Sequence, residues 1–303
     1  MRHHDNVILP RGVTGGGMPL GLLGVVGFSF SLPATRLAVT GLDPWFVAFG
    51  RAFGAGVLAA GYLVVSMRPG GGRGGPDGHQ LRRLGVVAVG VVVGFPLCTS
   101  LALTEQTAAH GAVVVALMPA VTTVFAVLRG DERPSRRFWV AATASFIAVT
   151  AFVASSGGFR GGPHGADLWL LAGVVLCALG YTEGGMLARD LGGARTICWA
   201  LVLSLPVTVT VTALTVGRGV GPGGFGPWLG FGYVTVISMF LGFFAWYAGL
   251  ARGGVARVGQ VQALQPVLTL AWSALVLSEP VSPTTVLAAF LVVGCVVMTQ
   301  RTR

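Results

Sequence analysis

Two stretches of this chain, 147 residues apart, carry the same pattern inside apolar surroundings. Residues 117–123 read LMPAVTT and residues 264–270 read LQPVLTL. Thirteen residues after each proline stands a glutamate, Glu132 in the first copy and Glu279 in the second, and a further apolar run follows each. Repeated halves in a membrane chain indicate a path across the bilayer at the place where the two halves meet.

The composition places the chain in a lipid bilayer. Of its 303 residues 53% are hydrophobic and 10% are charged, and its mean hydropathy is +0.78, whereas a soluble domain carries about 25% charged residues. The apolar stretches are continuous, which argues against the alternating pattern of a β-barrel. Each is close to the ~20 residues of a spanning helix. We therefore predict an all-α membrane protein with ten transmembrane helices, at 19–39, 45–67, 84–103, 108–128, 136–155, 167–188, 196–216, 227–250, 255–277 and 282–299.

The distribution of arginine predicts how these helices are oriented. All 20 basic residues are arginines, and with a cytoplasmic N-terminus sixteen of them fall in tails and loops on the cytoplasmic side. The positive-inside rule therefore favours cytoplasmic N- and C-termini. The same rule accounts for the net charge of +10 without a nucleic-acid partner. Arg2 and Arg11 precede the first apolar run as in a signal peptide, but no small-residue cleavage site precedes Val39, so we expect this run to be retained as a helix.

Ten helices divide into two sets of five, which we place at 19–155 and 167–299. Because five is odd, the second set enters the membrane from the opposite side, and the repeats are predicted to be inverted. The loop after the fourth predicted helix, RGDERPSRR, is rich in arginine, whereas its counterpart after the ninth, SEPVS, has none. The repeated pattern and the distribution of arginine therefore both predict that these two loops lie on opposite sides of the membrane.

The two copies of the pattern resemble a known family. Residues 100–139 (SLALTEQTAAHGAVVVALMPAVTTVFAVLRGDERPSRRFW) and 245–294 (AWYAGLARGGVARVGQVQALQPVLTLAWSALVLSEPVSPTTVLAAFLVVG) are similar to the EamA-type repeat of the drug/metabolite transporter superfamily, and PWFVAFGRAF, which contains Arg51, resembles the second helix of that family. The resemblance implies a central substrate cavity and, in bacteria, export of amino acids, metabolites or drugs. It also implies an acidic residue before the ninth-helix proline. Here Gln265 stands at that position and Met118 is its first-repeat counterpart, which leaves proton coupling there in doubt.

Prolines inside the predicted helices mark candidate kinks. A proline removes one backbone hydrogen bond and frees the carbonyl four residues earlier, and in lipid that carbonyl must face protein or a watery cavity. Pro119 and Pro266 occupy matched positions in the two copies. We predict that they kink the fourth and ninth helices around the path, the alternative being a packing role alone. The carbonyls freed by prolines include those of Ser29, Val115 and Gln262.

Glu183 is the deepest carboxylate in the predicted spans. A charge at mid-membrane costs at least ~2.5–3.5 kcal/mol, which makes such residues candidates for function. Glu183, with Tyr181 two residues before it, fits a substrate ammonium or a coupling proton. The alternative is an ion pair at the membrane interface with Arg189 or Arg195.

Arg51 and two glutamines complete the predicted substrate contacts. Arg51 in the second helix fits a substrate carboxylate, with pairing to Asp43 or Glu105, or snorkelling, as the alternative. Gln262 and Gln265 are three residues apart and so share a helix face. We predict that they line a polar cavity, the alternative being hydrogen bonds between helices.

The remaining polar residues carry weaker signals. His110 opens the fourth helix and is interpreted as a polar helix end rather than a titrating group. The four cysteines lie in spans without metal-ligand or disulfide spacing and are interpreted as buried small side chains. No nucleotide-binding, metalloprotease or hydrolase motif is present, so we expect neither an enzyme nor a cofactor.

The sequence as a whole predicts a transporter of the bacterial inner membrane that exports a small metabolite, amino acid or drug by alternating access. The expected partners are a small-molecule substrate and the lipid bilayer. Whether a proton is coupled to transport is a question that the sequence leaves open. Without an ATP site, uphill transport must draw on an ion gradient or on exchange. The alternatives are a non-transporting membrane protein, such as a sensor or an intramembrane enzyme, and a passive facilitator.

Overall fold

The computed structural model describes residues 16–66, 75–129 and 165–301, together with six isolated positions between 140 and 151. Every regular element in these residues is helical. Most of the predicted helix at 136–155 lies outside the described residues, and so does Glu132.

Seven helical segments in the described residues are long and apolar enough to cross a membrane. They begin and end within a few residues of the predicted spans, because continuous apolar runs bounded by polar turns fix where a spanning helix can lie. The predicted ninth helix appears as shorter pieces, and a last helix closes the chain. Ten helices are thus not shown.

The elements, in chain order, are α1 (Gly17–Ser29) with α2 (Ser31–Val39); α3 (Pro44–Ser66); α4 (Gly78–Val87), η1 (Ala88–Gly94) and α5 (Phe95–Glu105); α6 (Ala108–Val115) with α7 (Met118–Arg129); α9 (Gly165–Leu191); α10 (Gly193–Arg218); α11 (Phe225–Tyr233), η2 (Val234–Leu241) and α12 (Gly242–Gly253); α13 (Val255–Val258), η3 (Gly259–Leu264) and α14 (Gln265–Leu277); and α15 (Pro283–Arg301).

Several spans are interrupted partway along their length. The first breaks at Phe30, between α1 and α2, and the fourth breaks at a turn between α6 and α7. The segments η1 and η2 are π-helical, and η3 is a 3-10 helix. Pro119 and Pro266 are each the second residue of the helix that follows a break, α7 and α14. The missing N–H of proline accounts for a break at these points, since it cannot close the bond to the preceding turn.

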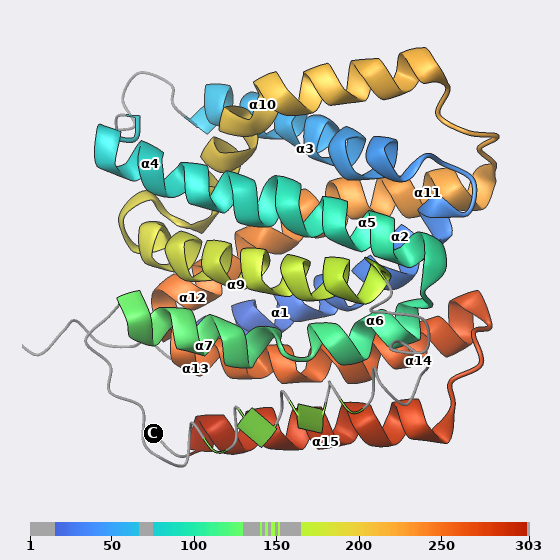
Figure 1. Cartoon of the computed structure of the whole chain (residues 1–303). Helices are drawn as coiled ribbons and strands as arrows, with labels where there is room; N and C mark the ends of the chain where they lie inside the picture. Colours follow the sequence, from blue (N-terminus) through green and yellow to red (C-terminus); the bar gives the residue numbers. More distant parts are fainter. Residues whose placement is uncertain are drawn as a thin grey trace, which may run out of the picture.

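The helices pack side by side in one bundle (Figure 1). In this view α10 and α3 lie at one edge and α15 lies at the other, with α9 between them. α3 packs along α10 and α1 packs along α12, whereas α9 contacts elements from most of the bundle, α5, α7 and α12 among them. Residues carried by α9 are therefore central in the molecule.

Glycines bring α1 and α12 into backbone contact. A Cβ atom added to Gly17 would lie 2.6 Å from the Cα of Gly253, and one added to Gly249 would lie 2.7 Å from the backbone nitrogen of Gly21. No other residue type leaves room for this approach. In a bilayer, where no hydrophobic effect drives helices together, such contacts supply the packing energy that joins them.

Candidate functional site: a central polar cavity

A cavity lies where the interruptions of the spans come together. It is bordered by the α1–α2 break, the η1–α5 junction, the α6–α7 turn, the η2–α12 junction and the η3–α14 junction, with α3 and α9 completing the wall. Irregular backbone at membrane depth occurs only where protein covers it or where it lines a cavity. The free volume is about 30 Å³, enough for about one water molecule. The lining residues are Phe28, Ser31, Leu32, Arg51, Val91, Phe95, Val115, Met118, Cys177, Tyr181, Ser238, Met239, Phe243, Gln262 and Gln265.

Arg51 supplies a positive charge to this cavity. It is 2% exposed, and its Nη1 donates a hydrogen bond of 3.3 Å to Thr35 Oγ1. Its Nε is buried without a hydrogen-bond partner, and no carboxylate of the described residues lies within ion-pair distance. Asp43, one of the predicted alternative partners, instead accepts a 2.9 Å bond from the backbone of Phe46. The guanidinium therefore lacks a compensating anion in this part of the chain.

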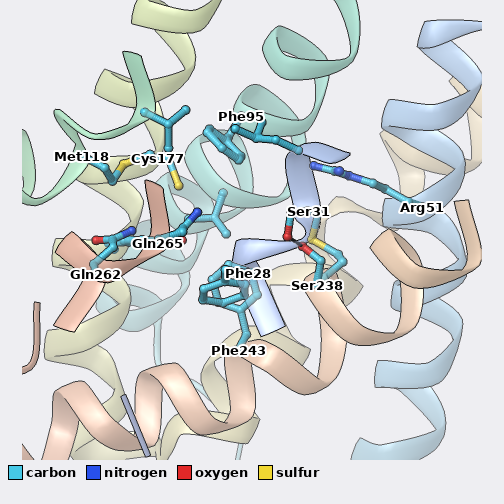
Figure 2. Close-up of a pocket in the computed structure, with 15 residues that line it drawn as sticks. Phe28, Ser31, Arg51, Phe95, Met118, Cys177, Ser238, Phe243, Gln262 and Gln265 are labelled. Atoms are coloured by element: carbon cyan, nitrogen blue, oxygen red, sulfur yellow. Dashed lines mark hydrogen bonds between the residues drawn. The ribbon is translucent and has the colours of Figure 1, made fainter. Parts of the chain in front are cut away.

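Gln262 and Gln265 lie on the other side of the cavity. Figure 2 shows their side chains entering from the side opposite Arg51, with Phe28 and Phe243 between the two groups. Both glutamines are buried, and the Oε1 atom of each has no hydrogen-bond partner among the described residues. An unsatisfied buried amide oxygen is unfavourable by roughly 1–3 kcal/mol. The cavity thus presents two acceptors that lack donors.

Aromatic rings form the apolar part of the wall. Phe28 and Phe243 have ring centroids 4.8 Å apart, and Tyr181 lies 5.9 Å from Phe243 and 5.4 Å from Trp246. Met118 and Met239, also in the lining, have flexible thioether chains that adapt to different shapes. Between its polar ends the cavity therefore offers an apolar and deformable surface.

Glu183 does not line this cavity. It is 1% exposed, and its Oε2 lies 2.6 Å from Arg83 Nε while its Oε1 lies 2.9 Å from Arg129 Nη1. These partners are neither Arg189 nor Arg195. They come from α4 and from the last residue of α7, so Glu183 joins α9 to two helices at the end of the bundle where α4 begins.

Glu279 makes a comparable contact at the opposite end, where α6 begins. Its two carboxylate oxygens accept hydrogen bonds from the backbone nitrogens of Ala108 and Ala109, at 3.0 and 3.1 Å. A carboxylate is stabilised there by the free N–H groups and the dipole of the helix. The interrupted span α6–α7 is therefore held at its start by Glu279 and at its end by Glu183.

The break in the first span is hydrogen-bonded to α14. The carbonyl of Ser29, which Pro33 leaves without its helical donor, accepts a 2.7 Å bond from Thr269 Oγ1. Trp272 Nε1 donates a 3.0 Å bond to Ser29 Oγ. The freed carbonyl thus faces protein, as expected, and the interruptions of two distant spans are joined directly.

Of the residues predicted as substrate contacts, Arg51, Tyr181, Gln262 and Gln265 come together around one cavity, and Glu183 lies apart from them. Sequence reasoning missed Cys177, interpreted only as a small buried residue, and the hydroxyls of Ser31 and Ser238, which are hydrogen-bonded to each other at 2.7 Å. It also missed Asp167, whose Oδ1 lies 2.7 Å from His110 Nε2. Their separations along the chain follow no local spacing, so no sequence signal joined them.

A bundle of apolar helices that is long enough to cross a bilayer several times, with a partly polar cavity among its interrupted spans, defines the class of multi-pass membrane proteins. The chain belongs to the EamA-like transporter family, whose sequence profile matches residues 15–154 and 164–300, and hence to the drug/metabolite transporter superfamily. An uncharacterized transporter of Bacillus subtilis (strain 168), YdeK, is 43% identical over 281 residues, which cover 93% of this chain and 96% of that protein.

A solved crystal structure shares the fold. It has a TM-score of 0.65 at 16% sequence identity, and the match covers 93% of this chain and 97% of the other. At that identity the likeness concerns the arrangement of helices alone. The family and the 43% identical relative identify the protein as a membrane transporter.

Proposed function

We propose that this protein exports a small amphipathic metabolite that carries a carboxylate, such as an amino acid, by alternating access. The observation that carries the proposal is the buried guanidinium of Arg51, which faces a cavity and has no carboxylate partner among the described residues. A substrate carboxylate would supply the missing anion through charge-assisted hydrogen bonds. The direction, export, follows from the family resemblance.

The rest of the cavity complements the other parts of such a substrate. The Oε1 atoms of Gln262 and Gln265 would accept hydrogen bonds from an ammonium, amide or hydroxyl group. Tyr181 and its neighbouring rings would contact the apolar portion. Because the present free volume of about 30 Å³ is far below the roughly 300–1,000 Å³ of a typical small-molecule site, binding requires the helices around the cavity to move apart. This conformation then corresponds to a carrier whose cavity is too small for its substrate.

The proposed architecture has ten helices in two inverted repeats, at 19–155 and 167–299. The two profile matches, at 15–154 and 164–300, support this division, and so does the repeated pattern of proline and glutamate. The arginine distribution supports cytoplasmic termini in the inner membrane of a bacterial cell. In this orientation the start of α6 faces outside and the start of α4 faces the cytoplasm.

Glu183 has a different role in this scheme from the one the sequence first suggested. Its contacts with Arg83 and Arg129 favour a tie that closes the cytoplasmic end over a direct contact with the substrate. Glu279 would close the outer end. Alternating access then consists of releasing one end while the other stays closed.

The proposal is tested by a thermal-shift screen of the purified protein, followed by counterflow in proteoliposomes. The screen compares amino acids, nucleosides and cationic drugs, and binding to the folded state raises the melting temperature. We expect carboxylate-bearing compounds to raise the melting temperature of the wild type but not of Arg51→Gln. A selective rise with cationic drugs alone would contradict the proposal. Net transport under an imposed proton gradient then separates the two modes: coupled uphill export stops when the gradient is collapsed, whereas passive downhill flux continues.

A further inference from the structure

We propose that His110 and Asp167 form a proton-binding site that controls the opening of the α6 end of the transporter. The inference rests on the alternating access proposed above and adds a regulator to it. His110 is the third residue of α6 and Asp167 the third residue of α9, and His110 Nε2 lies 2.7 Å from Asp167 Oδ1. The residues are 8% and 4% exposed, so both ionisable groups are buried.

The charge balance of this pair makes it responsive to protons. With a neutral imidazole the pair carries one negative charge, and Asp167 Oδ2 is buried without a hydrogen-bond partner in the described part of the chain. A lone buried carboxylate is unfavourable because it has left water without gaining a full set of partners. One added proton converts the imidazole to imidazolium, and the pair becomes neutral and is joined by a charge-assisted hydrogen bond. Proton uptake therefore tightens the contact between α6 and α9.

The pair lies at a place where such tightening reaches the cavity. α6 leads into Val115 and Met118, and α9 carries Cys177 and Tyr181, all of which line the cavity. The residues directly before His110, Ala108 and Ala109, receive the carboxylate of Glu279. Separation of α6 from α9 would open one wall of the cavity and bring water to Asp167. Acidic solution at this end thus favours closure, and a rise in pH favours opening.

Other charged side chains also lie at this end of the bundle. Among the described elements packed against α6, α2 carries Arg36, whose Nη1 donates to the carbonyls of Leu103 and Thr104. α5 ends at Glu105, which is exposed, and the α14–α15 connection carries Glu279. The side chain of Arg36 is bound to backbone carbonyls and that of Glu105 is exposed, whereas Glu279 binds the same helix turn as His110 and is the rival group. The test must separate Glu279 from His110.

The experiment measures how fast a membrane-impermeant thiol reagent reaches Cys177 from each side of proteoliposomes, at several pH values. Cys98, Cys198 and Cys295 are replaced by alanine so that Cys177 is the only thiol. The thiolate fraction itself rises with pH. The readout is therefore the ratio of the wild-type pH profile to that of His110→Gln or Asp167→Asn, with monodisperse gel filtration as the folding control. Glu279→Gln is the matched variant for the rival group.

From the α6 side we expect labelling of the wild type to be suppressed about ten-fold more by acid than labelling of either pair variant, the scale of one charge-assisted hydrogen bond. Glu279→Gln should keep the wild-type pH profile. Identical pH profiles of labelling in wild type and His110→Gln would overturn the inference. A pH effect that is lost only in Glu279→Gln would overturn it too. Both outcomes leave the proposed function standing. Absence of labelling at every pH and from both sides overturns the inference and alternating access together.

Discussion

Arg51 is the residue on which substrate recognition is expected to depend most. Its charge lies among apolar spans, and its Nη1 donates a hydrogen bond to Thr35. Holding a charge in a bilayer without an anion is unfavourable, and the proposed substrate carboxylate would supply one. Gln262 and Gln265 present unpartnered acceptors on the opposite side of the cavity, where the other end of the proposed substrate would lie.

Replacement of Arg51 by glutamine should weaken substrate binding by about ten- to a hundred-fold, since hydrogen bonds to a charged group contribute about 1.5–3 kcal/mol. Arg51→Lys should restore only part of the affinity, because an ammonium cannot make the bidentate contact of a guanidinium. Concentration-dependent counterflow gives the KM of each variant. Arg218→Gln, an exposed arginine at the end of α10, is the control and should leave KM unchanged. An unaltered KM in Arg51→Gln would remove the carboxylate from the proposed recognition.

Residue types told more about the site than spacing did. Five residues were predicted as substrate contacts from their types, and four of them, including Arg51 and Tyr181, line one cavity. Glu183 showed the limit of that reasoning: its partners Arg83 and Arg129 are 100 and 54 positions away. Only tertiary packing of α9 against α4 and α7 brings them together, and nearby arginines in the sequence pointed elsewhere.

At the scale of the helix, the main feature of the molecule is that the interruptions of the spans border the central cavity. Hydropathy predicted where the spans lie, because length and apolarity are set by the bilayer. It did not predict the π-helical segments η1 and η2, since no residue type marks a π-helix as proline marks a break. The stretch at 255–277 was predicted as one helix and is instead divided among α13, η3 and α14.

Pro266→Ala tests whether the break before α14 matters for transport. Alanine restores the N–H that could bond to the carbonyl of Gln262 and favours a continuous helix by removing a helix breaker. We expect the variant to be at least as stable as the wild type and to transport more slowly. Melting temperature and initial counterflow rate are measured on the same preparation, with Pro206→Ala, within the continuous helix α10, for comparison. Unchanged transport in a folded Pro266→Ala protein would assign the proline a packing role only.

The two carboxylates at the ends of α6–α7 should have opposite effects when neutralised. Glu183→Gln weakens the contacts with Arg83 and Arg129 and should favour opening at the α4 end. Glu279→Gln weakens the contacts at the start of α6, each worth about 0.3–1 kcal/mol for a charge at a helix terminus, and should favour opening at the α6 end. Sidedness of Cys177 labelling distinguishes them. A shift toward the same side in both variants would refute the assignment of the two ends.

For the molecule as a whole, alternating access predicts that Cys177 is reached from one side at a time. In the closed conformation the thiol is 1% exposed, and so it should react slowly. Addition of a transported substrate should speed labelling several-fold, because binding requires the cavity to widen. Cys198, buried and absent from the cavity lining, is the control thiol in a matched single-cysteine variant. Equal acceleration at both cysteines would indicate general loosening instead.

The division of the whole molecule into halves at 19–155 and 167–299 is a prediction from the sequence, because a repeat leaves a pattern that needs no structure to detect. The orientation of each half depends on loop charge, and many of the loop arginines, with Glu132, lie outside the described residues. Reporter fusions near Glu132 and Glu279 should fall on opposite sides of the membrane, as inverted repeats require.

The small volume of the cavity has a consequence for the proton gradient across the membrane. Protons cross membranes along files of hydrogen-bonded water, and a chamber with room for about one molecule cannot host such a file. Under the proposed alternating access, a carrier in this conformation would insulate the two compartments electrically. The same tight packing would exclude a metabolite until the helices part and would limit leakage between turnovers.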